Sequence, residues 1–346
     1  MRSRDPLVSI MIPNFNHARY LDECIQSALN QTYTNKEIIV LDNQSHDDSV
    51  AVAAKYMRHG VRVCRNVVNI VNFTFQVLAN QLARGEYRML LGADDAILPR
   101  FVEKAVAIME RYPNVGYVHG ERDFMREDGS LIELEPFFNC SFVAHGRSIM
   151  PIYMVTTIAH PAQGIYRRSV FERIGGYAME IDHMNADKSL WFYMSAVSDY
   201  AYIREKMCRI RVSSNNETAL TQQNFQHPAL CHLTINDFIR FAEQYGYPDV
   251  LARKEEALAR LAGDFLTYAG GMLANDKYDE AKAYLIYAKI LHRDIVSNER
   301  WQRLMSMYES KTPDLEYIKS NDTVFAARKR NYAPPQGFEE IDLEAV

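Results

Sequence analysis

LLGADDAILP, residues Leu90 to Pro99, joins an apolar run to two adjacent carboxylates, Asp94 and Asp95. The apolar run predicts a buried strand, and the small residues Gly92 and Ala93 then lead into an acidic turn. Neighbouring carboxylates repel each other unless a cation or hydrogen-bond donors lie beside them. Hard cations such as Mg²⁺ bind through one or two carboxylates together with substrate phosphates, which makes this turn a candidate metal and phosphate site. The alternative is a solvated turn in which an aspartate caps the next helix.

Composition and charge exclude several classes of protein. The chain has 346 residues, of which 48% are hydrophobic, and this suits a globular protein of one large or two smaller domains. The formal net charge of −5 gives no reason to expect nucleic acid as a partner. No apolar run approaches the roughly 18 residues of a membrane span, and the N-terminus lacks the apolar core of a secretory signal. We therefore expect a cytoplasmic protein, with its five scattered cysteines as reduced thiols.

Short apolar runs alternate with helical patterns through the first hundred residues. Strands are predicted at 7–12, 38–41, 61–64 and 87–91, and helices at 20–29, 50–57 and 73–82. This alternation predicts an α/β fold with a mostly parallel, Rossmann-like central sheet flanked by helices. Polar residues follow three of these strands, at 13–16, at Asp42, and at Asp94 with Asp95. Because ligands of open α/β sheets bind outside the carboxyl ends of the strands, these turns are predicted to form one site.

The second half of the chain shows weaker patterns. Short strands are predicted at 115–119 and 124–125, and a strand-like end at 208–212. Asp187 precedes helical spacing that continues to Val197, so it lies at the start of a helix. A carboxylate there is either a plain helix cap or a functional acid, and Asp182 and Glu180 are nearby alternatives.

Four motifs together resemble a known family. They are VSIMIPNFNHARYL, KEIIVLDNQSHDDS, ARGEYRMLLGADDAILP and IGGYAMEIDHMNADKSLW, in this order. The set resembles the family-2 glycosyltransferases, which have the GT-A fold and use nucleotide-sugar donors, and it spans roughly Leu7 to Val212. A dinucleotide-binding domain fits less well, because no G-x-G-x-x-G follows the first strand.

The resemblance implies a role for each motif. The residues implied to line the nucleotide-sugar pocket are Pro13, Asn14, Asn16, Asp42, Asn72, Asp94 and Arg211. Asp42 would contact the base, Asp94 the ribose, and Asp95 a Mg²⁺ or Mn²⁺ ion on the diphosphate. Asp187 would be the general base that takes the proton of an acceptor hydroxyl, in one displacement with inversion. UDP is the expected donor base, with dTDP or GDP as alternatives. A glycan or lipid-linked acceptor in cell-surface polysaccharide assembly is the expected setting.

Three positions depart from the family pattern: Gly92, Ala186 and Arg211. Family members usually have Glu where this chain has Ala186, and often a metal-binding His where it has Arg211. A guanidinium carries donors only, so Arg211 is expected to bind phosphate oxygens directly, or else to be a surface arginine at a strand end. The departures also leave open a nucleotide-sugar-binding regulatory or scaffold protein that has lost catalysis.

The expected organisation is a GT-A catalytic domain over residues 1–225, followed by a helical region over 226–310. Nucleotide-sugar binding is assigned to 1–100 and the acceptor side to 101–225. Within the helical region, YDEAKAYLIYA resembles half of a tetratricopeptide repeat, but such arrays need about three repeats to bury a core. We therefore expect a helical cap or a homo-oligomer contact, with any membrane contact peripheral. Residues 311–346 are expected to be a linker and a mobile tail.

Overall fold

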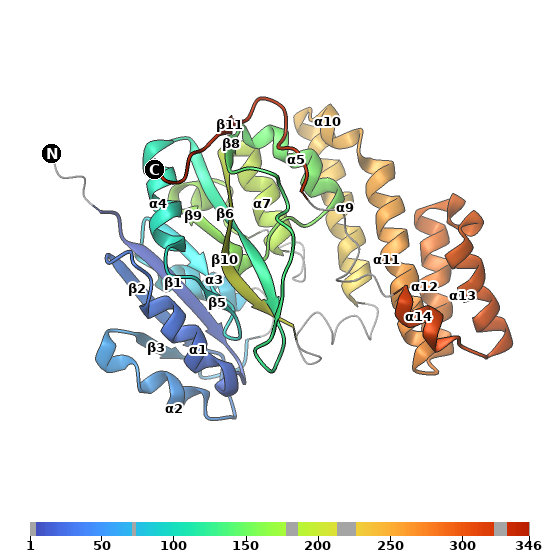
Figure 1. Cartoon of the computed structure of the whole chain (residues 1–346), viewed down its shortest axis with the longest axis horizontal. Coiled ribbons are helices and arrows are strands. Elements are labelled where there is room, and N and C mark those ends of the chain that lie inside the picture. The colour runs from blue at the N-terminus through green and yellow to red at the C-terminus, as the bar shows by residue number, and fades with distance from the viewer. Residues whose placement is uncertain (1–4, 71–73, 178–185, 213–225, 322–330, 346) are drawn as a thin grey trace. The chain divides into compact units, whose positions relative to one another are not determined.

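The computed structural model describes residues 5–70, 74–177, 186–212, 226–321 and 331–345 (Figure 1). It divides into two compact units. Unit 1 comprises 1–153, 157–213 and 330–346, and unit 2 comprises 154–156 and 214–329. Unit 1 contains the sheet and every residue of the predicted site that the structure describes.

The first 212 residues contain the following elements in chain order. They are β1 (Val8–Asn14), α1 (Ala18–Leu29), β2 (Lys36–Asp42), α2 (Ser49–Ala54), η1 (Met57–His59), β3 (Arg62–Arg65), α3 (Thr74–Leu82), β4 (Tyr87–Leu90), β5 (Ala96–Ile97), α4 (Phe101–Arg111), β6 (Val115–Met125), β7 (Leu131–Ile132), β8 (Phe142–Ala144), α5 (Gly146–Val155), η2 (Pro161–Gln163), β9 (Gly164–Arg167), α6 (Arg168–Arg173), α7 (Ala186–Val197) and β10 (Asp199–Arg211).

The strands form one mixed sheet in the order β11-β8-β10-β6-β9-β4-β1-β2-β3, with β5 paired to β10 and β7 to β6. β4, β1, β2 and β3 are parallel neighbours, and β9 runs antiparallel between β4 and β6. This arrangement confirms the α/β fold predicted from the alternating pattern. Asn14 is paired directly with Asp42, so the carboxyl ends of β1 and β2 meet at one edge, as the site prediction requires.

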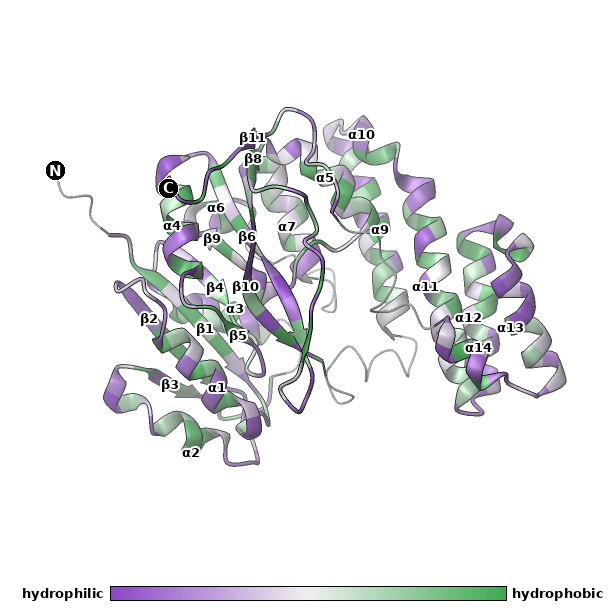
Figure 2. Ribbon diagram, in the orientation of Figure 1, coloured by the Kyte–Doolittle hydropathy of each residue, from purple (hydrophilic) through white to green (hydrophobic). Residues whose placement is uncertain are grey.

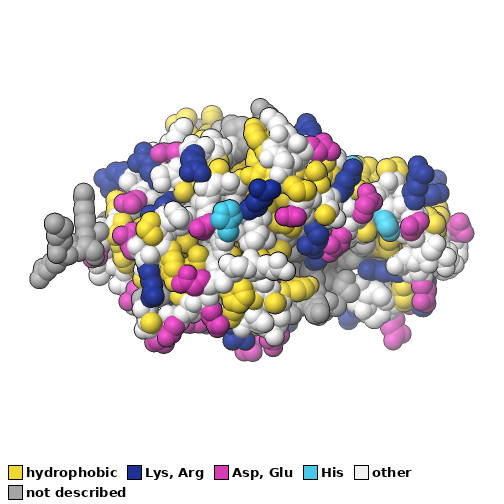
Figure 3. Space-filling model, turned by 90° about the horizontal axis from the view of Figure 1, so that it is seen from above, with side chains coloured by type: hydrophobic (Ala, Val, Ile, Leu, Met, Phe, Trp, Pro, Cys, Tyr) yellow, Lys and Arg dark blue, Asp and Glu magenta, His cyan; other side chains and the backbone are white. Residues whose placement is uncertain are grey.

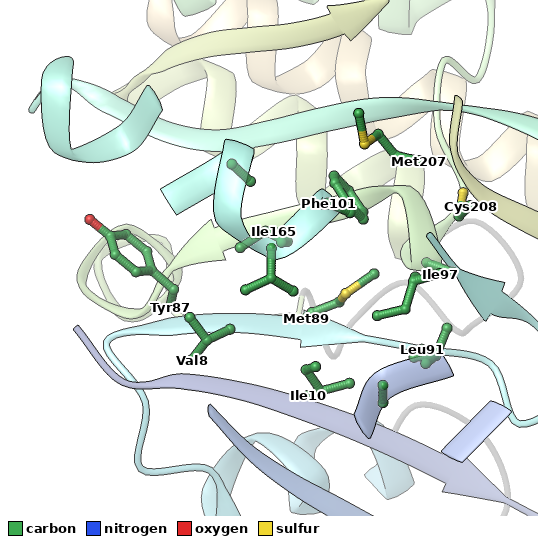
Figure 4. Close-up of a cluster of buried hydrophobic side chains, with 14 of the residues drawn as sticks. Val8, Ile10, Tyr87, Met89, Leu91, Ile97, Phe101, Ile165, Met207 and Cys208 are labelled. Carbon is green, nitrogen blue, oxygen red and sulfur yellow. The ribbon is translucent and has the colours of Figure 1, made fainter. Parts of the chain in front are cut away.

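One face of the sheet packs against α1 and α4. Val8, Ile10 and Ile12 alternate along β1 and belong to the same buried cluster as residues of both helices. Figure 4 shows Met89, Ile165 and Phe101 gathered in this layer. Because the strands are buried on both faces, their ends are held by a close-packed platform, and the turns that follow them start from fixed positions.

The two short strands predicted at 115–119 and 124–125 are one continuous strand, β6. The prediction was interrupted by hydrophilic residues in the middle of the strand, which Figure 2 shows in purple. Glu121 lies at the centre of this segment and is buried. Its Oε1 accepts hydrogen bonds from the Tyr202 hydroxyl at 2.7 Å and the Phe137 backbone N–H at 2.9 Å. Hydrogen-bond donors distant in sequence therefore satisfy the Glu121 carboxylate, which allows it to lie in the middle of a buried strand.

The end of the chain differs from the expected mobile tail. β11 (Glu339–Glu340) pairs antiparallel with β8, and Ile341 is only 6% exposed. The Tyr112 hydroxyl donates a hydrogen bond to Glu339 at 2.7 Å. The acidic composition of this segment concealed a strand that covers the edge of the sheet and places one apolar side chain in the core.

Unit 2 is helical over its described residues. It contains α9 (Gln226–Tyr245), α10 (Pro248–Leu251), α11 (Lys254–Ala274), α12 (Tyr278–Leu291), η3 (Arg293–Ser297), α13 (Glu299–Ser310) and α14 (Leu315–Ser320). The helices continue past the predicted end at residue 310, since α14 follows. Asp314 caps the start of α14 by accepting a hydrogen bond from the Tyr317 N–H. None of the helices described is long and apolar enough to cross a membrane. Figure 3 shows acidic and basic side chains interspersed on one face of the molecule.

Candidate functional site

The turns after β1 and β2 are joined in one hydrogen-bond network. Asn14 Nδ2 donates to Asp42 Oδ1 at 2.9 Å and to Ser45 Oγ at 3.1 Å. Asn16 adopts a left-handed φ of 57°, which places its N–H 2.9 Å from the same Ser45 Oγ. Asn and Asp tolerate this conformation better than other side chains, so the local sequence suits the turn. The predicted residues Asn14, Asn16 and Asp42 are therefore brought together, beside Pro13 at the end of β1.

Asp42 is almost completely buried, with 1% of its surface exposed. Its Oδ2 accepts a hydrogen bond from the Ser45 N–H at 3.0 Å and lies 3.5 Å from Arg65 Nε. An ionised carboxylate has about four acceptor sites, so these contacts leave room for a further donor. Asp42 thus orders the turn in addition to any contact it makes with a ligand.

Sequence reasoning missed two residues of this edge. Asn43 Oδ1 accepts from the Ile70 N–H at 2.9 Å, and Asn43 Nδ2 donates to the Ile70 carbonyl at 2.7 Å. Ser45 receives the Asn14 and Asn16 donors described above. The only sequence feature that indicated them is the polar run directly after β2. Asn72 was also predicted to line the site, but it lies outside the described residues.

The acidic turn after β4 is closed by a hydrogen bond from the Asp95 N–H to the Gly92 carbonyl at 3.0 Å. A Cβ on Gly92 would lie 2.6 Å from Asp95 Oδ2 and 3.3 Å from Asp94 Oδ1. Both carboxylates therefore border the small space beside Gly92, and any side chain at that position would displace them. Burial and the neighbouring charge of Asp94 raise the pKa of Asp95 well above its usual range, and a hydrogen bond from the Arg211 N–H opposes this shift.

This pair of oxygen donors fits a hard divalent cation, since such ions compensate carboxylates that repel each other. In the described ranges, no group of three or more His, Cys, Asp or Glu side chains is arranged to hold a metal. A cation at Asp94 and Asp95 would therefore need further ligands from substrate phosphates or water.

Arg211 lies beside the acidic turn, but its contacts differ from both expectations. It is 5% exposed, so it is not a surface arginine. Its Nε donates to the Asp94 carbonyl at 2.9 Å, Nη1 to the Arg126 carbonyl at 3.0 Å, and Nη2 to Glu23 Oε2 at 2.6 Å. Each nitrogen of the guanidinium thus already has a protein partner, and this geometry does not present Arg211 as a phosphate ligand.

Asp187 occupies the first turn of α7 and borders a small pocket. The other residues that line this pocket are Gln76, Leu90, Pro161, Tyr166, Tyr177, Leu190 and Trp191. Burial raises the pKa of Asp187 to about 6, although the Lys188 N–H, which donates to its Oδ1 at 2.8 Å, opposes the shift. Leu90 is the last residue of β4, so Asp187 and the acidic turn lie at the same end of that strand. The alternatives Glu180 and Asp182 lie outside the described residues.

The raised pKa predicts how Asp187 affects stability. Its folded-state pKa of about 6 exceeds the ordinary value of 3.8, so ionisation of Asp187 destabilises the folded protein. This destabilisation is complete above about pH 6 and absent below about pH 4. We expect Asp187→Asn to stabilise the protein at pH 7.5 by up to about 3 kcal/mol, raising Tm by a few degrees. Thermal unfolding at pH 7.5 and 4.5 measures this, and the gain should shrink at the lower pH. Asp187 is half-buried, and an unchanged Tm at pH 7.5 would contradict its raised pKa.

Comparison with known proteins identifies the class. Residues 9–175 match the model of glycosyl transferase family 2. An uncharacterized glycosyltransferase of Rickettsia typhi is 28% identical over 227 residues, which cover 63% of this chain and 68% of that protein. Chondroitin synthase of Escherichia coli is 31% identical over 132 residues, which cover 37% of this chain and 19% of the synthase.

Solved structures share the fold. S. aureus TarS 1–349 in complex with UDP-GlcNAc has a TM-score of 0.58 at 14% identity, with 92% of this chain and 91% of TarS 1–349 covered. Mannosyltransferase PcManGT from Pyrobaculum calidifontis, in complex with GDP-Man and Mn²⁺, has a TM-score of 0.53 at 17% identity, with 94% and 89% covered. These likenesses show that the sheet is of the GT-A type. Residues 9–175 thus form a family-2 glycosyltransferase domain, as the four sequence motifs predicted.

Proposed function

We propose that this glycosyltransferase moves a sugar from a nucleoside diphosphate, with UDP as the favoured base, to a hydroxyl acceptor with inversion at the anomeric carbon. One observation carries the proposal: Asp187 and Leu90 line the same pocket, and Leu90 leads directly into the Asp94–Asp95 turn. A base for the acceptor and an acidic turn for the leaving group thus flank one end of β4.

Asp187 has the properties that a general base needs. A pKa of about 6 leaves it ionised at neutral pH, yet makes it a stronger proton acceptor than an ordinary aspartate. Among the described residues that line the pocket, Asp187 is the only acid. A general base that takes the proton of the acceptor hydroxyl suits a single in-line displacement with inversion.

Asp94 and Asp95 would hold a Mg²⁺ or Mn²⁺ ion, which supplies positive charge to the departing diphosphate. Their two carboxylate oxygens border one space beside Gly92, and the hydrogen bond from the Asp95 N–H to the Gly92 carbonyl closes the turn around it. The complexes of TarS with UDP-GlcNAc and of PcManGT with GDP-Man and Mn²⁺ support both the class of donor and the use of a cation.

The turns after β1 and β2 would receive the nucleoside. Asn14, Asn16 and Asp42 belong to one hydrogen-bond network there, and Phe15 in the same turn has 40% of its surface exposed. An aromatic ring in this position offers a stacking surface for a base. Asp94 would contact the ribose from the neighbouring strand end.

Replacing Asp42 tests the nucleoside site. We expect Asp42→Ala to weaken UDP binding by about 10- to 150-fold, the equivalent of about 1.5–3 kcal/mol for a lost hydrogen bond to a charged group. Calorimetric titration of UDP measures the effect. Asp22→Ala is the matched control, because Asp22 on α1 also accepts hydrogen bonds, from Tyr56 and Gln26, but lies outside the network. A folded Asp42→Ala protein with wild-type affinity would remove Asp42 from the site.

We propose a glycan or lipid-linked acceptor in cell-surface polysaccharide assembly, with unit 2 as the place for a homo-oligomer or peripheral membrane contact. The test of the whole function is acceptor-dependent release of UDP from UDP-sugars. A nucleotide-sugar-binding scaffold without catalysis would bind the same donors, raise its Tm with them, and release no UDP.

A further inference from the structure

We propose that Arg211 is a positioning residue that fixes the acidic turn to helix α1. It thereby keeps the cation-binding turn and the nucleoside-binding turn in fixed positions relative to each other. The functional part of this inference rests on the proposed function of the two turns. Its structural part concerns contacts within the protein and is tested separately below.

Arg211 holds the acidic turn at both aspartates. Its backbone N–H donates to Asp95 Oδ1 at 2.9 Å, and its side-chain Nε donates to the Asp94 carbonyl at 2.9 Å. The first contact directs one oxygen of the Asp95 carboxylate toward β10 and leaves the other, Oδ2, beside Gly92. One residue thus sets both the path of the turn and the orientation of a carboxylate in it.

The other side of the guanidinium is attached to α1. Nη2 pairs with Glu23 Oε2 at 2.6 Å, and the guanidinium carbon lies 4.2 Å from the centre of the Tyr20 ring. Tyr20 and Glu23 are three positions apart and therefore share one face of the helix. The end of β6 adds a third anchor through the Arg126 carbonyl.

Helix α1 extends this connection to the nucleoside side. It starts at Ala18, directly after the Asn14–Asn16 turn, and the Ala18 N–H donates to Asp47 Oδ2 at 2.9 Å in the segment after β2. A displacement of α1 would therefore move the nucleoside turn relative to the acidic turn. Arg211 and Glu23 resist this displacement from the side of the acidic turn.

Arginine is the residue type that these contacts require. Its planar guanidinium offers five donors in fixed directions, whereas the ammonium of lysine is a point charge on a flexible stem. Arg211 is 5% exposed, and its Nη2 pairs with Glu23, whose side chain is 49% exposed. Removing Glu23 would leave the buried guanidinium with the Asp94 and Arg126 carbonyls as its oxygen partners.

The structural part is tested by amide hydrogen exchange of the ligand-free protein. Residues 92–97 are expected to exchange about tenfold faster in Arg211→Ala and in Glu23→Ala, because local opening becomes easier when the anchor is lost. Glu172→Ala is the matched control: the Arg168–Glu172 and Arg211–Glu23 pairs are both 2.6 Å long, and the two glutamates are 53% and 49% exposed. Glu23→Gln keeps a hydrogen-bond acceptor and should restore most of the protection. Wild-type exchange of the turn in folded Arg211→Ala and Glu23→Ala would overturn the positioning role.

The functional part is tested by UDP titration with and without Mn²⁺. In Arg211→Ala and Glu23→Ala, UDP affinity without metal should stay within about twofold, while the gain in affinity from Mn²⁺ should fall by about 10- to 100-fold, as when groups that orient metal ligands are removed. A direct phosphate ligand would instead lower the affinity without metal in Arg211→Ala but not in Glu23→Ala, and that result would overturn the inference. Failure of the wild type to bind UDP at all would refute the proposed function, and hydrogen exchange would then decide the role of Arg211 by itself.

Discussion

Asp187→Asn is expected to lower the rate of sugar transfer by about two to four decades, the contribution of a positioned general base. The amide keeps the shape of the side chain and can still accept the 2.8 Å hydrogen bond from the Lys188 N–H. It cannot take the proton of an acceptor hydroxyl. Donor affinity should change little, because the loss concerns the transition state and not the bound donor. Steady-state kinetics with a UDP-sugar and a matching acceptor, combined with calorimetry of the donor, separates the two effects.

The pH dependence provides an independent check. With a pKa of about 6, wild-type kcat/KM should fall about tenfold per pH unit below pH 6 and level off above it. Among the described residues, the charged groups that act on Asp187 are Lys188 and Arg122, and Asp187 also influences the pKa values of Tyr153 and Tyr177. Asp199→Asn, at the start of the strand after α7, is the control and should keep the wild-type profile. An Asp187→Asn enzyme whose transfer rate is within a few fold of wild type, and whose kcat/KM still falls below pH 6, would show that the base is another residue.

Much of the sheet and of the acidic turn could be predicted from the sequence, because burial imposes a visible pattern. An apolar run such as Ile38–Leu41 has to lie in a strand buried on both faces, and the polar residue that follows it has to lie at the edge of the sheet. The parallel pairing of β1 with β2 and β4 then brings Asn14, Asp42 and the acidic turn to the same end. Local pattern and topology were sufficient for these positions.

The partners of buried charges could not be predicted from local pattern and topology. Arg211 pairs with Glu23, 188 positions earlier in the chain, and Glu121 pairs with Tyr202, 81 positions later. Periodicity records which residues are buried but not which polar groups meet, so the pairing of Arg211 with Glu23 could not be predicted. The strand β11 was missed for a related reason, since only Ile341 in an acidic segment is buried.

Two departures from the family pattern have structural explanations that do not require a loss of catalysis. Gly92 leaves the space into which Asp95 Oδ2 extends, 2.6 Å from the position of a Cβ. Ala186 is 6% exposed at the start of α7, where a longer acidic side chain would add a second charge to a buried layer. Asp187 beside it remains at the pocket. These features favour an active enzyme over a scaffold.

Asp95→Asn is expected to lower transfer by about 10²–10³, the size of effect seen when one group that stabilises developing charge is removed. It should also abolish stimulation by Mn²⁺, because the neutral amide no longer attracts a cation to the space beside Gly92. Asp94→Asn is the informative comparison: a ribose contact should raise KM for the donor while leaving stimulation by Mn²⁺ largely intact. Transfer rates measured over a range of Mn²⁺ concentrations, and in excess chelator, distinguish the two variants. An Asp95→Asn enzyme that Mn²⁺ still stimulates as strongly as wild type would show that the cation is held elsewhere.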